Sequence, residues 1–130
     1  MMSAGTILVV EDDNIQREEL VTILRRQGFR VLTASDGNEA LNLLSSRPVP
    51  DLILLDMLIL DGYFDGWWFL EQRQRFPALA SVPVIITTAL TIASREWATS
   101  LGAAGLLRKP IETEALLLEI RRCLSMAERS

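Results

Sequence analysis

Short runs of apolar residues alternate along this chain with segments in which apolar residues recur at helical spacing. The runs, such as ILVV, LILL and VPVII, are continuous rather than alternating, which is typical of strands that are covered on both faces. They predict five strands, at Thr6–Val10, Arg30–Ala34, Leu52–Leu55, Val82–Thr87 and Gly105–Arg108.

The segments between and after these strands predict five helices. Asp13 or Asn14 precedes the first helix and Gly28 follows it, Asp36 precedes the second and Pro77 follows the third; these are common start and stop signals. The predicted helices cover about Ile15–Gln27, Asn38–Ser45, Gly66–Arg75, Ile92–Leu101 and Glu112–Met126. This alternating order predicts one α/β domain, in which helices cover both faces of a parallel sheet.

The last predicted helix has an apolar stripe at helical spacing, which we expect to face the sheet. The stripe consists of Ala115, Leu116, Leu118, Ile120 and Leu124.

Composition and charge exclude several classes of function. The chain has 130 residues, of which 49% are hydrophobic and 23% charged, as in one soluble domain with its own core. Its apolar runs are too short to span a bilayer, and no basic residue precedes the first run as in a secretory signal. A net charge of −4 without a basic block makes nucleic acid a poor candidate partner.

Two residue types are informative because they are scarce. The chain has no histidine, which excludes imidazole catalysis and any histidine-ligated metal. Its single cysteine, Cys123, cannot form an internal disulfide, and we expect a buried helix residue rather than a reactive thiol. The simplest location is therefore a reducing cytoplasm.

Polar residues at the strand ends carry the candidate chemistry. Glu11 and Asp12 follow the first strand, Asp56 ends the third, Thr88 the fourth, and Lys109 follows the fifth. Ligands of an open parallel sheet bind outside the carboxyl ends of its strands. We therefore expect these five side chains to lie together at one edge of the sheet.

A carboxylate at position 56 needs a compensating charge, because LILLDMLIL surrounds it with apolar residues and an unpaired buried charge costs several kcal/mol. Carboxylates from two strands also repel one another unless a cation neutralises them. Oxygen ligands without histidine or thiolate favour Mg²⁺ or Mn²⁺, and Lys109 would supply a second positive charge. An aspartate beside a divalent ion can attack phosphorus as a nucleophile.

Four motifs follow one another at compatible spacings: ILVVEDD at 7–13, DLILLD at 51–56, PVIITTA at 83–89 and GAAGLLRKP at 102–110, with an Asp-Gly pair at 65–66. On these motifs the chain resembles, over about residues 5–127, the receiver domain of two-component response regulators, of the chemotaxis type that consists of one domain. The resemblance implies the flavodoxin-like (βα)5 fold, a doubly wound five-stranded parallel sheet in a three-layer α/β/α arrangement.

The resemblance implies a function in phosphorelay signal transduction. Asp56 would be the phosphoacceptor, and it would take a phosphoryl group from a histidine kinase or a phosphotransfer protein. Thr88 would hydrogen-bond one phosphoryl oxygen and Lys109 would pair with another. The protein would not be an enzyme beyond self-catalysed phosphoryl transfer and dephosphorylation.

The resemblance also implies a Mg²⁺ or Mn²⁺ site. Asp12 and Asp56 would bind the ion directly, Leu58 through its backbone carbonyl, and Glu11 through water.

Two features depart from the family pattern. After Asp56, Ile59-Leu60 replace the usual Met-Pro pair, and Asp65-Gly66 lie two residues farther on than usual; either the loop is longer or Asp61-Gly62 form a shorter turn. Both alternatives affect the position of the Leu58 carbonyl.

The second departure lies three residues before the lysine, where the family usually has Tyr or Phe, whose ring turns inward on activation. This chain has Leu106 there, an aliphatic side chain that can pack inward but has no ring.

Partners follow from the same resemblance. Residues 1–130 are predicted to form one receiver domain without an output domain, so that the output would be a downstream protein or a domain outside these residues. It would dock on the face formed by the predicted helix 92–101, strand 105–108 and helix 112–126. Trp67, Trp68 and Phe69 cannot all face the core; burial suits Phe69 best, and an exposed remainder could serve partner docking or a homodimer.

Two other functions compete with this interpretation. The altered loop and Leu106 would also suit a pseudo-receiver, an interaction module that does not depend on phosphorylation. A phosphohydrolase resembling the haloacid dehalogenase group would need a second Asp two residues after the nucleophile, where this chain has Leu58.

Overall fold

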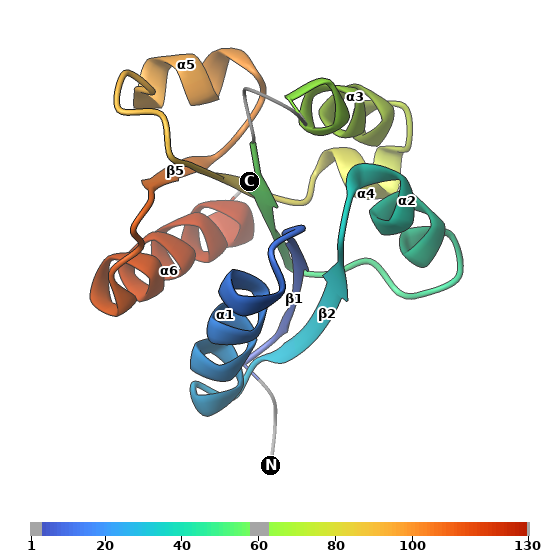
Figure 1. The fold of residues 1–130 in the computed structure, drawn as a ribbon. Coiled ribbons are helices and arrows are strands. Elements are labelled where there is room, and N and C mark those ends of the chain that lie inside the picture. Colours follow the sequence, from blue (N-terminus) through green and yellow to red (C-terminus); the bar gives the residue numbers. More distant parts are fainter. Residues whose placement is uncertain (1–3, 58–62, 130) are drawn as a thin grey trace.

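A five-stranded parallel sheet forms the centre of the fold (Figure 1). The computed structural model describes residues 4–57 and 63–129. The strands lie in the order β2-β1-β3-β4-β5, which is the flavodoxin-like order, so the predicted fold class is confirmed. The strands are β1 (Thr6–Val10), β2 (Arg30–Ala34), β3 (Leu52–Asp56), β4 (Val84–Thr88) and β5 (Gly105–Arg108).

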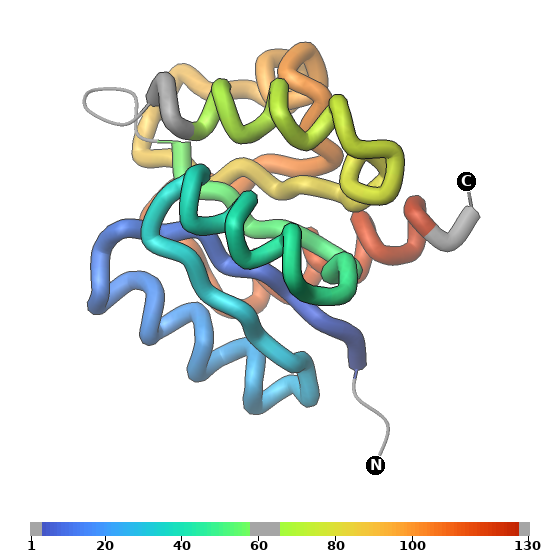
Figure 2. The backbone as a smooth tube through the Cα atoms, turned by 90° about the vertical axis from the view of Figure 1, so that its right-hand side faces the viewer, coloured from blue at the N-terminus to red at the C-terminus, as the bar shows by residue number. Residues whose placement is uncertain are grey.

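Helices cover both faces of this sheet (Figures 1 and 2). They are α1 (Asn14–Arg26), α2 (Gly37–Ser45), α3 (Tyr63–Gln74), α4 (Pro77–Ala80), α5 (Arg95–Ser100) and α6 (Thr113–Arg129). Helices α1 and α6 pack on one face, and α2 to α5 lie on the other. Within the described residues, no helix has the length and hydropathy that a bilayer crossing requires.

Successive residues of each strand serve two separate hydrophobic cores. Ile7 and Val9 of β1 pack with α1 and α6, whereas Leu8 and Val10 pack against the helices of the opposite face. All four side chains are buried. Because both faces of the sheet are covered, the strands need apolar residues at every position, which explains the continuous runs in the sequence.

Side-chain caps set the starts of several helices. Asp13 accepts a hydrogen bond of 2.8 Å from the Gln16 N–H at the start of α1, and Asp36 accepts one of 2.8 Å from the Glu39 N–H at the start of α2. Each bond satisfies a backbone donor that has no partner within the helix. Of the two candidate caps before α1, the structure thus uses Asp13.

Several helices differ from the sequence prediction: α3 begins at Tyr63 rather than Gly66, and α6 ends at Arg129 rather than Met126. Helix α5 begins at Arg95 rather than Ile92, because Ser94 caps it by accepting from the Trp97 N–H at 3.1 Å. Pro77 does not only end α3 but also starts the short helix α4, a position where its missing N–H costs nothing.

The apolar stripe predicted for α6 is also partly wrong. Leu118 is 65% exposed, and Glu119 beside it is buried. Helix α6 therefore turns a carboxylate toward the sheet.

The aromatic start of α3 divides between core and surface. Phe69 is fully buried, while Trp67 and Trp68 are 41% and 39% exposed, as expected for three consecutive helical residues. Gly66 allows α3 to lie close to the residue after Asp56: a Cβ at Gly66 would lie 2.3 Å from the Met57 sulfur. A larger residue at position 66 would therefore force the buried Met57 side chain, or the helix itself, to shift.

Candidate functional site

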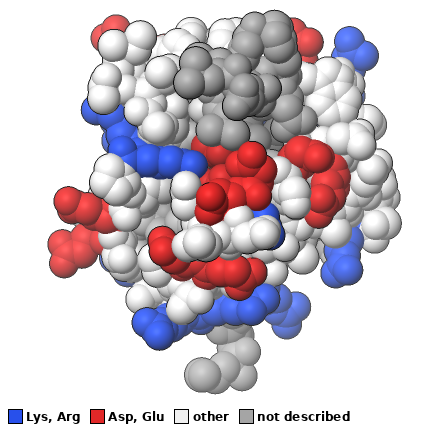
Figure 3. Space-filling view, in the orientation of Figure 1, with Lys and Arg blue, Asp and Glu red and all other residues white. Residues whose placement is uncertain are grey.

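The ends of β1, β3 and β4 lie side by side at the carboxyl edge of the sheet. Parallel pairing sets Val10 opposite Leu55 and Asp56 opposite Thr87. Glu11 and Asp12 follow the end of β1 directly. Figure 3 shows acidic side chains gathered at the centre of this face.

Three carboxylates meet at this edge. One carboxylate oxygen from each of Glu11, Asp12 and Asp56 lies within 4.8 Å of the others. Glu11 is buried, Asp56 is half-buried and Asp12 is exposed. The group therefore opens to solvent on the Asp12 side, where a ligand could approach.

Lys109 supplies a positive charge to two of these carboxylates. Its Nζ donates a 2.8 Å hydrogen bond to Glu11 Oε1 and lies 3.0 Å from Asp56 Oδ1. Burial alone would lower the pKa of Lys109, but the contacts with Glu11 and Asp56 outweigh it and raise this pKa above its ordinary value. The lysine therefore remains charged.

One oxygen of Asp56 is incompletely satisfied. Asp56 Oδ1 is buried, and the described residues offer it no hydrogen bond of good geometry; its contact with Lys109 is a charge–charge contact. Three carboxylates and one ammonium group also leave excess negative charge. Both observations fit a divalent cation, and the oxygen-only ligand set suits Mg²⁺ or Mn²⁺.

The pKa of Asp12 is also shifted by these surroundings. Loss of part of its hydration, together with its neighbour Glu11, raises the pKa of Asp12 above its ordinary value. The ionised form of Asp12 is therefore less favourable here than in water, and a bound cation would offset this cost.

Thr88 is buried at the end of β4, beside the loop that leads to α5. Its hydroxyl donates to the Met57 carbonyl at 3.3 Å and accepts from the Leu90 N–H at 3.2 Å. The side chain thus connects the residue after Asp56 with the start of the next loop. The bond to Met57 is long for a hydroxyl donor, so a better acceptor could replace it.

Of two further predicted positions, the structure describes Leu106 but not Leu58. Leu58 lies outside the described residues, as do Ile59, Leu60 and the 61–62 pair. Leu106 is buried against the core of the α2–α5 face, so the aliphatic residue at the usual aromatic position does pack inward.

Sequence reasoning missed two contacts of the site. It paired Lys109 with Asp56 but not with Glu11, because the ion pair joins residues 98 positions apart in the chain. It also missed Arg17, whose Nη1 donates a 2.8 Å hydrogen bond to the Glu11 carbonyl. A backbone acceptor leaves no trace in the sequence, and only the position of Arg17 one turn after the Asp13 cap hinted at it.

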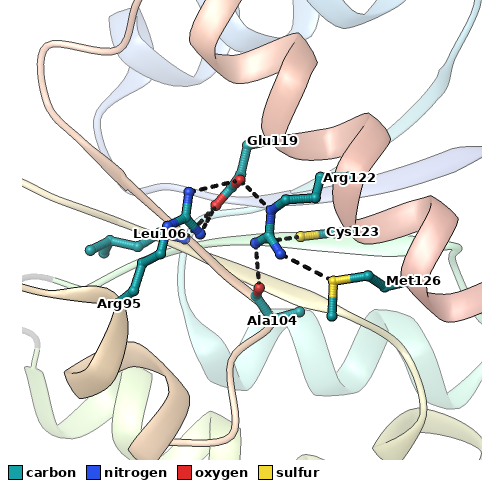
Figure 4. Close-up of polar contacts among 7 residues, drawn as sticks. All are labelled: Arg95, Ala104, Leu106, Glu119, Arg122, Cys123 and Met126. Atoms are coloured by element: carbon teal, nitrogen blue, oxygen red, sulfur yellow. Dashed lines mark hydrogen bonds and ion pairs between the residues drawn. The ribbon is translucent and has the colours of Figure 1, made fainter.

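A second buried carboxylate, Glu119 of α6, accepts hydrogen bonds from residues of α5, β5 and α6 (Figure 4). Glu119 accepts from Arg95 at 2.8 and 3.1 Å, from Arg122 at 2.8 Å, and from the Leu106 N–H at 3.0 Å. Gly105 makes room for it, because a Cβ there would lie 2.6 Å from Glu119 Oε2. Burial alone would raise the pKa of Glu119, but these donors lower it to about 2. We call Glu119, Arg95, Arg122 and Leu106 the Glu119 cluster.

Cys123 lies next to this cluster and is a buried free thiol. Burial raises its pKa, so the thiol is protonated and unreactive, as predicted.

Comparisons with known proteins agree with this geometry. The response regulator receiver domain, as a family, matches residues 7–121. The chain is 35% identical to the probable transcriptional regulator ycf27 of Guillardia theta, over 95% of this chain and 47% of that protein. It is 30% identical to protein PilH of Pseudomonas aeruginosa, over 92% of this chain and 97% of that protein.

A solved structure is similar over almost its whole length. It is the signal receiver domain of a signal transduction histidine kinase from Syntrophus aciditrophicus, with a TM-score of 0.81 and 32% identity over 98% of this chain and 95% of that one. The chain spans about half the length of the curated transcription regulators that it matches. Since the family match extends over most of the chain and both relatives and structure agree with it, the chain belongs to the family of response regulator receiver domains.

Proposed function

We propose that this receiver domain accepts a phosphoryl group on Asp56 in a Mg²⁺-dependent reaction, from a histidine kinase, a phosphotransfer protein or a small phosphodonor. The observation that carries the proposal is the environment of Asp56 Oδ1, which is buried, incompletely hydrogen-bonded and 3.0 Å from Lys109 Nζ. An ionised carboxylate oxygen that is not held by other donors is available as a nucleophile.

In the proposed step, a carboxylate oxygen of Asp56 attacks the phosphorus of the donor. A new O–P bond forms, and the bond from phosphorus to the leaving group breaks with its electron pair on that group, which is acetate when acetyl phosphate is the donor. Lys109 would pair with one phosphoryl oxygen. Positioning and charge neutralisation supply most of the catalysis in such transfers.

The metal ligands proposed are Asp12 and Asp56, the Leu58 carbonyl, and Glu11 through water. A bound Mg²⁺ would neutralise the carboxylates and the charge that develops on the phosphoryl oxygens. Glu11 already holds Lys109 at 2.8 Å, so it would also keep the ammonium group beside the acceptor.

Thr88 would carry the signal outward. Donation to a phosphoryl oxygen would replace its 3.3 Å bond to Met57, and its bond from the Leu90 N–H would draw the loop before α5 along. We propose that a downstream protein reads this change on the face of α5, β5 and α6. A homodimer through the exposed Trp67 and Trp68 stays a prediction, as does a cytoplasmic location.

The test is the intact mass after incubation with acetyl phosphate, with Mg²⁺ and with excess chelator. We expect the wild type to gain one phosphoryl group with Mg²⁺ only. Asp56→Asn should gain none. Asp13→Asn is the matched control, because asparagine caps a helix as well as aspartate does, and it should be labelled like the wild type.

Two results would contradict the proposal: no added phosphate on the wild type, or undiminished labelling of Asp56→Asn. The first result would favour the phosphorylation-independent interaction module. Rapid turnover of phosphate esters would instead indicate a phosphohydrolase, whereas slow loss of phosphate from the labelled protein agrees with self-catalysed dephosphorylation.

A further inference from the structure

We propose that Arg17 is a positioning residue for the metal site: its guanidinium fixes the peptide between Glu11 and Asp12 and thereby aims the Asp12 carboxylate. The inference rests on the proposed metal site. It concerns a side chain of α1 that binds no ligand itself.

Arg17 contacts the connection between β1 and α1 at several points. Its Nη1 donates to the Glu11 carbonyl at 2.8 Å and lies 3.5 Å from the Asp12 carbonyl. Its Nη2 donates to the Asn14 side chain. One guanidinium group therefore bridges successive carbonyl oxygens of the acidic segment and the first residue of α1.

The Glu11 carbonyl needs this donor because it lies just beyond the strand ladder. The register between β1 and β3 ends at Val10 and Leu55, and the Glu11 N–H bonds to the Ala34 carbonyl at the end of β2. The Glu11 N–H belongs to the peptide before Glu11 and the Glu11 carbonyl to the peptide after it, so Ala34 holds the first of these peptides and Arg17 holds the second, which leads to Asp12. Arginine suits the task, since its planar fork reaches two acceptors at once and lysine does not.

Asp12 depends on this backbone for its position. Its side chain is exposed, whereas Glu11 is held by Lys109 and by burial. If the peptide before Asp12 rotates, its carboxylate leaves the group of three oxygens that lie within 4.8 Å of one another. Loss of such an indirect support lowers metal affinity by about 10-fold or more.

Electrostatic repulsion alone predicts the opposite change in Mg²⁺ affinity when Arg17 is replaced. A guanidinium group near a cation site repels the cation, so removal of its charge should tighten Mg²⁺ binding. The positioning role instead predicts weaker binding in spite of the lost repulsion. The sign of the change therefore separates the two explanations.

The experiment measures the Mg²⁺ dissociation constant by titration calorimetry for the wild type, Arg17→Gln and Arg17→Lys. We expect affinity to fall roughly 10-fold in both variants, because lysine keeps the charge but loses the fork. Arg25→Gln is the matched control: it removes the same charge from the exposed far end of α1, and its affinity should change less than about two-fold.

A second readout separates positioning from a general loss of structure. The Mg²⁺ concentration for half-maximal labelling by acetyl phosphate should rise in both Arg17 variants, while the rate at saturating Mg²⁺ stays close to that of the wild type. Equal or tighter Mg²⁺ binding by Arg17→Gln would overturn the positioning role alone. Absence of Mg²⁺ binding by the wild type would overturn the metal site itself, and this role with it.

Discussion

Glu11 and Glu119 are both buried glutamates, but they lie in opposite electrostatic surroundings. Glu11 shares one ammonium group with Asp56 and stands beside a third carboxylate, Asp12. Glu119 has two guanidinium groups and one backbone N–H to itself. Negative charge is in excess around Glu11 and positive charge around Glu119.

This difference separates a fully paired cluster from a site whose carboxylates could still bind a cation. The Glu119 cluster is satisfied, and the pKa of Glu119 lies far below its ordinary value. At the strand ends the pKa of Asp12 is raised, and Asp56 Oδ1 lacks a well-aligned donor within the described chain. Buried charge alone therefore does not mark function, whereas incomplete neutralisation does.

The largest expected effect is the loss of stability in Glu119→Gln. The change leaves Arg95 and Arg122 without their counter-charge, and we expect the free energy of unfolding to fall by roughly 2–3 kcal/mol. The figure is at the low end for a buried pair because the two arginine side chains are 60% and 39% exposed. Urea unfolding measures it. Glu71→Gln, at an exposed position of α3, should stay within about 0.5 kcal/mol of the wild type.

Acid should remove the same contribution. The pKa of Glu119 is about 2 in the folded state against 4.5 for the ordinary group, so the unfolded chain binds more protons between these values and stability rises with pH there. The gap between wild type and Glu119→Gln should be complete above pH 4.5 and shrink by about 2 kcal/mol as the pH falls toward 2. If urea unfolding at pH values from 7 to about 2 gives a constant difference in unfolding free energy between the two proteins, the result contradicts the assigned ion pairs.

Magnesium should stabilise the strand-end site and not depend on the Glu119 cluster. At a Mg²⁺ concentration of about 10–30 times the dissociation constant, the wild type should gain about 1.5–2 kcal/mol in unfolding free energy. Glu119→Gln should gain the same increment, while Asp12→Asn should gain none. An increment retained by Asp12→Asn would place the ion elsewhere.

The smallest expected effect is a gain in stability, whereas most mutations destabilise a protein. Without divalent cations, Asp12→Asn should stabilise the protein by about 0.5 kcal/mol, because it removes one of three crowded charges at a solvent-exposed position. The gain should decrease at high salt, which screens exposed charges. A destabilised Asp12→Asn in chelator would show that Asp12 has a structural partner at this edge.

The sequence predicts the sheet better than it predicts the side-chain contacts. Strands β1, β2 and β5 have the predicted bounds, and the ends of β3 and β4 differ from the prediction by one or two residues. Helix α4 was missed since four residues show no period. The inward side of α6 was misjudged, because Leu118 and Glu119 are neighbours and Glu119 is paired not only with Arg122 one turn away but also with Arg95, 24 positions away in the chain.

The candidate site was likewise predictable from the sequence only in part. The meeting of Glu11, Asp12, Asp56 and Lys109 follows from the parallel order of the strands, since each lies at a carboxyl end. The contact of Arg17 with a carbonyl oxygen could not be predicted, because a sequence does not encode backbone acceptors.

The bond between Glu119 and the Leu106 N–H has a consequence for association between molecules. Strand β5 is an edge of the sheet, and an unpaired N–H on such a strand invites a foreign strand to add to it. A carboxylate already occupies this donor, 3.0 Å away, so the Leu106 N–H is not available to an added strand. One route to aggregation through β5 is thereby made less favourable.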